Sequence, residues 1–598
     1  MTDTPAKRLA ALRRAMLAHG IDAWLVPSAD PHLSEYLPEH FQGRAWLSGF
    51  TGSAGVLLLT QHFAGLWVDS RYWVQAAQAL EGTGIEMMKA TQGLAPIDWL
   101  AEQEEQGEKA LTLGFDAALV SLADRRRIAD RLGPRAVLIE HLDLLDDIWP
   151  DRPALPEAPV VAHAEALCEA PRGEHLRALR QAMKAHGASA HLLSSLDDIA
   201  WLFNLRGADV AYNPVFLAHA LIDTKEAHLF IDRRRIEAGL AAELARDGVT
   251  LHDYAAVHEA LSALPEGTRL LLDPARVVSA LTRRIGEGVN LVEAAQPTTL
   301  FKAQKTSDAL ARVAAVMARD GRALCRFFCR FETAMAHGET LTELDVDAWL
   351  TAERAKEAGF VSRSFPTIAG FNANGALPHY RATDQAHAAI RGDGLLLIDS
   401  GGQYEDGTTD ITRMVAVGHL TPAQRRDCTL VLKGLIALST TRFPDGLEGP
   451  RLDAIARAPL WVAGLDYGHG TGHGVGYFLN VHEGPQVISK NAQPTPQTAL
   501  REGMITSIEP GIYRPGQWGV RLENLVANRR SADHPDFLDF ETLTLCPFDT
   551  RCLAPDLLTE HEIAWLDDYH ARVHDTLAPG LDDTTRAWLE ARTAPLAG

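Results

Sequence analysis

The first half of the chain contains the same segment twice. Residues Leu9 to Gly20 recur as Leu176 to Gly187, 167 positions later, with apolar residues at helical spacing and a glycine closing each copy. A glycine directly after the last periodic residue is typical of a helix C-terminus. The later matches, in the same order, are Ala45-Trp46-Leu47 with Ala200-Trp201-Leu202, Gly52 with Gly207, and Asp69 and Arg71 with Asp232 and Arg234. These matches predict two copies of one α/β unit.

Proline-rich stretches mark where the units end. Five prolines lie between Pro150 and Pro171, which is typical of a linker. A second boundary is expected between Ala295 and Ser307, before a long helical pattern that runs from Asp308 to about Ala336. Alternating helix and strand signals favour α/β or α+β packing. We therefore expect an α/β domain over 1–155, its repeat over 156–305, a larger domain over 306–545 and a helical C-terminal extension over 546–598.

The charge balance excludes some classes of partner. Lysine and arginine number 57 and aspartate and glutamate 78, which gives a net charge of -21. Such a surface repels phosphate backbones, so no nucleic-acid partner is expected. The N-terminus lacks the apolar core of a signal peptide, and no apolar run reaches the ~20 residues of a membrane span. The six cysteines are scattered; Cys325 and Cys329 could form a metal pair, although packing in a core is the simpler interpretation. These features favour a cytoplasmic protein with no membrane partner.

Two acidic residues in the third domain lie where neighbouring strands are expected. Asp399 ends an apolar run that begins at Leu395, and Asp410 opens the strand-like run from Ile411 to Val417. A hairpin-like return between these runs would place both carboxylates side by side.

Three further residues complete a possible ligand set. His473 lies among closely spaced glycines, Glu509 ends a strand-like run before Pro510, and Glu523 follows fourteen residues later. Each residue alone has a simpler interpretation as a turn residue, a cap or an ion-pair partner. Together, four carboxylates and one imidazole suit hard or borderline divalent cations. Their four negative charges balance two such cations, and a metal pair can activate water.

Five segments around these residues form a recognisable set: Leu397–Tyr404, Gly407–Arg413, Gly470–Gly476, Glu509–Gly511 and Arg521–Asn524. Through them the chain resembles the X-prolyl aminopeptidase (aminopeptidase P) family of pita-bread metallopeptidases, over almost its full length. The two repeated units before them resemble the long, three-domain form of this family. The resemblance implies two creatinase-N-like α/β domains followed by a pita-bread catalytic domain with a helical C-terminal extension.

The same resemblance assigns the metal ligands. It implies that Asp399 binds one metal, that Asp410 and Glu523 bridge both, and that His473 and Glu509 bind the other. The match departs slightly in the segment that ends at Glu509, where an acidic residue often precedes the ligand. That position is not a ligand, so the assignment is unaffected.

Four other residues are assigned to the site by resemblance. His379, in the turn-rich loop from Phe371 to Tyr380, would bind the substrate carbonyl and stabilise the oxyanion. His469 and His482 match positions that line the substrate pocket. An i, i+4 pair of His469 and His473 on a helix could bind zinc instead, but four glycines between 468 and 474 disfavour a helix. Arg521 lies two residues before Glu523 and would share its face if both lie on one strand.

The expected reaction is removal of the first residue from peptides with proline in the second position. A hydroxide bridging two divalent metals would attack the carbonyl, and Glu509 would relay the proton. Manganese is expected, with cobalt, zinc or iron as alternatives, and the family implies a homodimer. One alternative is a prolidase, which cleaves only X-Pro dipeptides. Another is a metal-free pita-bread binding module, but those members have lost several ligands and this chain retains all five.

Overall fold

The computed structural model describes residues 4–90, 95–104 and 110–596. The chain forms two compact units, Met1–Glu165 with Ala170–Thr298, and Ala166–Glu169 with Thr299–Gly598. Within the described ranges, no helix combines the length and apolar composition that crossing a membrane requires.

The first unit contains two six-stranded sheets with the same strand order. The first is ordered β4-β3-β2-β1-β5-β6 and the second β12-β11-β10-β8-β13-β14. Their strands are β1 (Ala23–Pro27), β2 (Val56–Thr60), β3 (Ala64–Val68), β4 (Glu86–Lys89), β5 (Thr112–Phe115), β6 (Val137–Ile139), β8 (Ala190–Leu193), β10 (His219–Asp223), β11 (Ala227–Phe230), β12 (Val249–His252), β13 (Arg269–Leu272) and β14 (Asn290–Glu293). In each sheet the two pairings that follow the first strand are antiparallel and the outer ones parallel. This confirms the predicted duplication.

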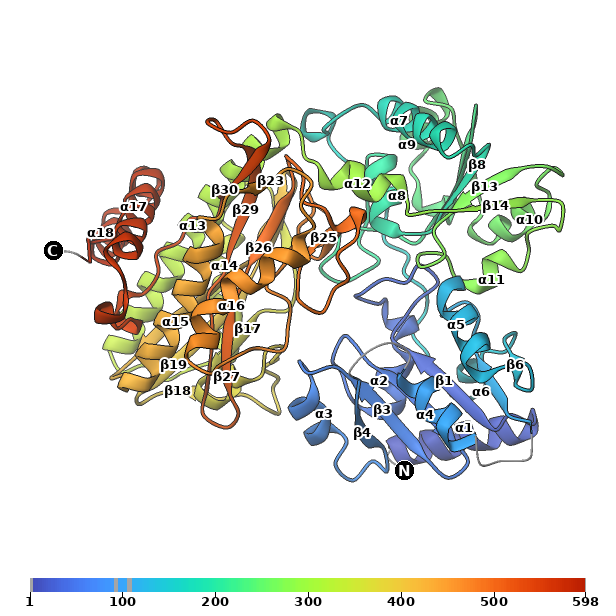
Figure 1. Cartoon of the computed structure of the whole chain (residues 1–598), viewed down its shortest axis with the longest axis horizontal. Helices are drawn as coiled ribbons and strands as arrows, with labels where there is room; N and C mark the ends of the chain where they lie inside the picture. Colours follow the sequence, from blue (N-terminus) through green and yellow to red (C-terminus); the bar gives the residue numbers. More distant parts are fainter. Residues whose placement is uncertain (1–3, 91–94, 105–109, 597–598) are drawn as a thin grey trace. The chain divides into compact units, whose positions relative to one another are not determined.

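Helices cover these sheets (Figure 1). They are α1 (Pro5–Ala18), α2 (Gly43–Ser48), α3 (Trp73–Ala79), α4 (Ala95–Glu104), α5 (Leu122–Leu132), α6 (Leu144–Ile148), α7 (Arg172–Ala185), α8 (Leu196–Leu202), α9 (Ala238–Arg246), α10 (Val257–Ser262) and α11 (Ser279–Thr282). A further pair of short strands joins β7 (Val161–Ala162), within the predicted linker, to β9 (Leu205–Arg206).

Local details of the two copies agree as well. Gly20 and Gly187, which follow α1 and α7, have left-handed φ angles of 67° and 65°, so each terminates its helix in the conformation that glycine permits. Asp69 accepts from Arg71 at 2.7 Å and Asp232 from Arg234 at 2.6 Å. The repeated sequence therefore encodes repeated turns as well as repeated elements.

The second unit is built from several short sheets and long helices. Its strands are β15 (Leu341–Thr342), β16 (Phe360–Arg363), β17 (Ile368–Phe371), β18 (Ala389–Ile390), β19 (Gly394–Ser400), β20 (Gly402–Tyr404), β21 (Gly407–Thr408), β22 (Ile411–Val417), β23 (Phe443–Pro444), β24 (Gly472–Gly474), β25 (Glu483–Ile488), β26 (Ile505–Ile508), β27 (Gly511–Arg514), β28 (Trp518–Arg521), β29 (Asn524–Arg530) and β30 (Phe537–Thr542). Its helices are α13 (Ser307–Ala336), α14 (Glu343–Arg354), α15 (Pro422–Ser439), α16 (Asp453–Val462), α17 (Glu560–Leu577) and α18 (Asp583–Arg592).

Two of these sheets position the candidate site. One has the order β17-β19-β22 and the other β23-β30-β29-β26-β24-β25. Strand β19 is buried along its whole length because its apolar run packs on both faces. Helix α14 packs against β17, and α15 packs against β26 and β28.

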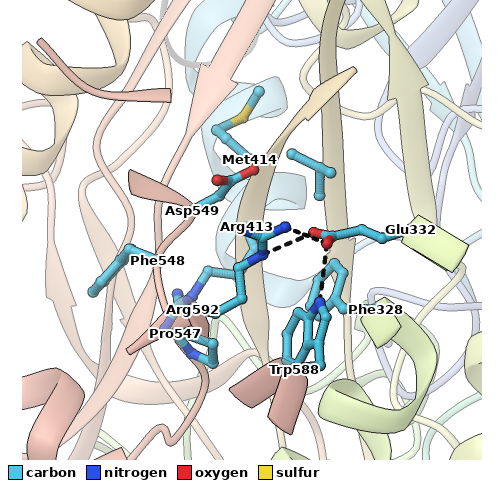
Figure 2. Close-up of a pocket in the computed structure, with 10 residues that line it drawn as sticks. Phe328, Glu332, Arg413, Met414, Pro547, Phe548, Asp549, Trp588 and Arg592 are labelled. Carbon is cyan, nitrogen blue, oxygen red and sulfur yellow. Dashed lines mark hydrogen bonds and ion pairs between the residues drawn. The ribbon is translucent and has the colours of Figure 1, made fainter. Parts of the chain in front are cut away.

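The C-terminal extension packs on α13, as predicted. Helices α17 and α18, red in Figure 1, lie beside that helix. Glu332 of α13 accepts hydrogen bonds from Trp588 Nε1 at 3.0 Å and Arg592 Nε at 3.2 Å, and Figure 2 shows these side chains in one pocket with Arg413. Arg413 in turn donates to Tyr569 Oη at 2.9 Å.

One short helix was not expected. The segment interpreted only as a boundary forms α12 (Pro297–Ala303). Its first residue is a proline, and proline is favoured at the first position of a helix because its missing N–H would be unpaired there anyway.

Candidate metal centre

The hairpin-like return between Asp399 and Asp410 is present. Strand β19 pairs antiparallel with β22, with Asp399 opposite Thr412, and Asp410 directly precedes β22. The connection is longer than a tight turn, since β20 and β21 form a small sheet of their own with β16. Both carboxylates are buried, at 7% and 5% exposure.

The other three predicted ligands come from the second sheet and its edge. His473 is the central residue of β24, which pairs with β26 through Gly474 and Thr506. Glu509 directly follows β26, and Glu523 lies between β28 and β29. Because β26 also pairs with β29, these three side chains start from adjacent strands.

Donor atoms of Asp410, His473 and Glu523 lie within 4.8 Å of one another. His473 Nε2 is 3.5 Å from Asp410 Oδ2 and 3.4 Å from Glu509 Oε1. Four of the five predicted ligands are thus joined by direct distances. Asp399 connects to Glu523 indirectly, because Arg521 donates both to Asp399 Oδ2 and to Thr412 Oγ1, and Thr412 Oγ1 donates to Glu523 Oε2.

The tautomer of His473 leaves a lone pair facing these carboxylates. Its Nδ1 lies 3.0 Å from the carbonyl oxygen of Gly474, which can only accept, so Nδ1 carries the hydrogen. In the neutral ring, Nε2 is then an acceptor surrounded by carboxylate oxygens. A ring that donates through its other nitrogen to a carbonyl is the usual arrangement of a metal-binding histidine.

Burial and neighbouring negative charges disfavour the ionised form of three of these carboxylates. Burial, followed by the charges of Asp399 and Glu509, raises the pKa of Asp410 well above its usual value. Burial and the charge of Asp410 do the same to Glu523. Burial raises the pKa of Glu509 to about 7, although Arg521 opposes this change. Crowded, desolvated carboxylates of this kind are neutralised by bound protons or by cations.

Two buried oxygens at the centre fit a metal pair. Asp399 Oδ1 and Glu523 Oε1 have no hydrogen-bond partner among the described residues. The second oxygen of each is held: Arg521 donates to Asp399 Oδ2 at 2.5 Å, and Thr412 Oγ1 donates to Glu523 Oε2 at 2.9 Å. Each carboxylate is therefore fixed through one oxygen and presents the other as a free ligand, so the donor set fits divalent cations.

Arg521 begins a hydrogen-bonded chain that reaches His469. It donates through its second terminal nitrogen to Tyr513 Oη at 2.7 Å, and Tyr513 Oη lies 2.8 Å from His469 Nε2. His469 Nδ1 lies 2.7 Å from the carbonyl oxygen of Gly470 and so carries a hydrogen. In the neutral ring Tyr513 therefore donates to His469 Nε2, and the two contacts fix the orientation of the imidazole.

The remaining predicted residues lie around this group. His482 directly precedes β25, and its ring meets the His473 ring edge-on with centroids 4.4 Å apart. His379 is half-buried in the loop between the short 3₁₀ helix Asn372–Ala376 and β18. Its contact with substrate stays a prediction. Arg521 and Glu523 do not lie on one strand, because β28 ends at Arg521 and Glu523 lies in the connection to β29, so the condition for a shared strand face is not met.

Sequence reasoning missed Tyr513 and Thr412. Tyr513 lies four residues after Glu509 on β27, and Thr412 lies two residues after Asp410 on β22. Alternation along a strand was the available signal, since side chains two apart lie on the same face. Applied to β22, it would have placed Thr412 beside the ligands.

Known families and proteins match the whole chain. The profile of metallopeptidase family M24 matches residues 311–529, its C-terminal region 536–596, and creatinase/prolidase N-terminal domains 8–148 and 151–308. A probable Xaa-Pro aminopeptidase P of Aspergillus fumigatus is 38% identical over 100% of this chain and 93% of its own. Aminopeptidase P2 of Arabidopsis thaliana is 35% identical over 99% of this chain and 88% of its own.

A solved structure agrees with the fold. The X-prolyl aminopeptidase of Caenorhabditis elegans, described as a cytosolic enzyme with a di-nuclear active site, has a TM-score of 0.94 at 32% identity, with 100% of both chains covered. Sequence and structure thus agree over the two N-terminal domains, the metallopeptidase domain and the C-terminal extension. The chain belongs to the Xaa-Pro aminopeptidase P family of M24 metallopeptidases.

Proposed function

We propose that this chain releases the N-terminal residue of peptides that carry proline in the second position, using two divalent cations. The observation that carries the proposal is the arrangement of Asp410, His473 and Glu523, whose donor atoms lie within 4.8 Å of one another. The unpartnered oxygens of Asp399 and Glu523 support it further. Manganese is the proposed metal because the donors are mostly oxygen, with cobalt, zinc or iron as alternatives.

The ligands are proposed to divide between two cations. Asp399 would hold one cation, His473 and Glu509 the other, and Asp410 and Glu523 would bridge them. When bound, such a pair supplies Lewis acidity and a hydroxide nucleophile near neutral pH. The hydrogen bonds from Arg521 and Thr412 fix the carboxylates before any cation arrives, so little reorganisation is needed.

Glu509 is the proposed proton carrier. Its side chain is 18% exposed, whereas the other carboxylates of the centre are more deeply buried, so it can exchange a proton with an incoming substrate. Ser507 Oγ donates to Glu509 Oε1 at 3.3 Å and holds the carboxylate in place. A general base must lie within hydrogen-bond reach of its proton, and the partial exposure of Glu509 leaves room for such an approach.

The surrounding histidines are proposed to bind the substrate. His379 would donate to the carbonyl oxygen as negative charge develops, and His469 and His482 would line the pocket for the proline ring. The Arg521–Tyr513–His469 chain supports this role, because it fixes the orientation of the His469 ring. Proline lacks an N–H and has a fixed φ, so its pocket needs apolar walls more than amide acceptors.

Peptide length separates this proposal from prolidase activity. The protein would be stripped with a chelator, reconstituted with manganese and assayed on Ala-Pro, Ala-Pro-Ala and an Arg-Pro-Pro peptide. We expect release of alanine from the tripeptide and of arginine from the longer peptide. A strong preference for the Ala-Pro dipeptide would show a prolidase instead. A folded protein that never binds divalent metal would favour a binding module.

The proposal extends to location and assembly. We propose a cytoplasmic enzyme, because the C. elegans relative is described as cytosolic. We also propose a homodimer, as the family resemblance implies. Light scattering coupled to size-exclusion chromatography gives the mass in solution directly, and a mass of one chain at micromolar concentration would contradict the dimer.

A further inference from the structure

A buried glutamate outside the ligand set organises the loop that carries His379. Glu343 is the first residue of α14, and its side chain has no exposed surface. Its Oε1 accepts from Phe371 N at 2.7 Å and from Asn374 Nδ2 at 3.0 Å. Its Oε2 accepts from Tyr380 Oη at 2.8 Å and from Ala388 N at 2.7 Å. One carboxylate thus ties down four points of a single loop.

These four donors are all neutral groups. A carboxylate that accepts only from backbone N–H groups, an amide and a phenol is not half of an ion pair. Its charge is stabilised by the orientation of the donors, and the donors are in turn fixed by the charge. Burial, together with Glu343, raises the pKa of the Tyr380 phenol well above its usual value, so the phenol keeps its hydrogen and donates.

The loop is also held from two other sides. Asn372 has a left-handed φ of 48°, accepts from Leu395 N at 3.1 Å and donates to the Asp393 carbonyl at 3.2 Å. On the far side, Gly519 of β28 approaches the loop so closely that a Cβ there would lie 1.7 Å from Gly375 O. Strand β28 ends at Arg521 of the candidate centre, so the loop is packed directly against the strand that holds Asp399 in place.

We propose that Glu343 and Tyr380 are positioning residues that hold His379 where it meets the substrate carbonyl. Tyr380 is the next residue after His379, so anchoring its side chain fixes the backbone on which the imidazole is carried. This inference rests on the oxyanion role proposed for His379. Glu343, at the N-terminus of α14, would then act on the reaction only through the loop that carries His379.

The alternative is that the network only stabilises the fold. The two hypotheses predict different losses of activity when a hydrogen bond of the network is removed by mutation. A positioning role acts through His379, so it vanishes once His379 is removed. A structural role lowers activity or stability to the same degree whether His379 is present or not. A double-mutant cycle separates these cases because it measures the coupling between two side chains.

The variants are Tyr380→Phe, Glu343→Gln and His379→Ala, with Tyr380→Phe also made in the His379→Ala background. Tyr380→Phe removes only the hydroxyl. Glu343→Gln keeps the shape but turns an N–H₂ group toward donors. The control is Tyr72→Phe, which removes a buried hydroxyl in the first unit, where Tyr72 Oη lies 2.8 Å from Ser53 Oγ.

Each variant is measured for metal content, thermal unfolding, kcat and KM on Ala-Pro-Ala. Because a displacement of about 1 Å can cost ~10²-fold in rate, we expect Tyr380→Phe and Glu343→Gln to lower kcat about 10- to 100-fold with KM changed less than about twofold. Metal content should stay at the wild-type value. In the His379→Ala background, Tyr380→Phe should add less than about a twofold further loss. The control should lose stability comparably to Tyr380→Phe and keep its kcat.

Two results would overturn the inference. One is an equal fractional loss of kcat from Tyr380→Phe in both backgrounds, and the other is a wild-type kcat in Tyr380→Phe. Should Glu343→Gln fail to fold, the Tyr380→Phe cycle still decides the question. Near-normal turnover in His379→Ala alone would instead remove the proposed role of His379, which distinguishes failure of the proposed function from failure of this inference.

Discussion

Replacing Glu509 by glutamine tests whether the acidic cluster is organised around cations. In the metal-free protein, burial raises the pKa of Glu509 from 4.5 to about 7. The folded protein then binds this proton more tightly than the unfolded chain does. The bound proton therefore contributes to the stability of the folded protein at low pH. This contribution is lost as the pH rises from about 4.5 to about 7, because the unfolded chain gives up the proton first.

The size of the effect follows from the two pKa values. One pKa unit corresponds to about 1.36 kcal/mol, so the difference between 4.5 and about 7 costs the metal-free protein about 3 kcal/mol at high pH. Glutamine cannot ionise and avoids this cost. We expect metal-free Glu509→Gln to be more stable than the metal-free wild type by about 2–3 kcal/mol at about pH 8, and nearly equal to it at about pH 4.

The assay is urea unfolding of chelator-treated protein, followed by circular dichroism. A chain of several domains unfolds in steps, so the transition that manganese shifts is the one to compare. Glu541→Gln is the control. Glu541 lies on β30 of the same unit, is exposed, and forms an ion pair with Arg529 of β29. The variant at Glu509 should also bind manganese more weakly. If metal-free Glu509→Gln is instead less stable than wild type at about pH 8, Glu509 serves as a structural ion-pair partner and the reasoning is wrong.

Three further predictions follow from the same contacts. His379→Ala should retain its metals yet lose most turnover, and near-normal kcat would remove His379 from the mechanism. Gly519→Ala should lower both kcat and the melting temperature, because the new methyl group would lie 1.7 Å from Gly375 O, whereas Gly173→Ala, with nothing within 4 Å, should lower neither. Tyr569→Phe should cost about 1–3 kcal/mol in urea unfolding and weaken manganese binding in a calorimetric titration. The reason is that Arg413, which bonds Tyr569, also donates to the carbonyl oxygen of Glu523 at 2.6 Å; unchanged manganese affinity would contradict that link.

Much of the architecture was readable from sequence because it rests on local signals. The repeated helices end at glycines with left-handed φ angles. Because glycine adopts this conformation most easily, a glycine after a helical pattern can be recognised in the sequence as a helix end. The apolar run before Asp399 predicted a buried strand, and β19 is buried along its length. The five proposed ligands could be nominated from sequence because each lies at a strand end or a turn and because the surrounding segments resemble those of a known family.

The supporting residues were not predictable in the same way. Glu343 lies 36 residues before His379, at the start of a helix, where an acidic residue is already favoured by the helix dipole. Nothing local distinguishes it from an ordinary first-turn glutamate, since its four donors come from a loop that only the tertiary fold brings near. Tyr513 likewise has a role only through its hydrogen bonds to Arg521 and His469. The contact with Arg521 requires the hairpin of β27 and β28.

Anomalous scattering from crystals grown with manganese tests the central claim most directly. We predict two peaks per chain, both within coordination distance of the set Asp399, Asp410, His473, Glu509 and Glu523, and their loss from this set in Asp410→Asn. Well-diffracting crystals of active protein with no peak among these side chains, or with peaks only at the surface, would contradict the proposal that this chain hydrolyses peptides at a two-cation centre.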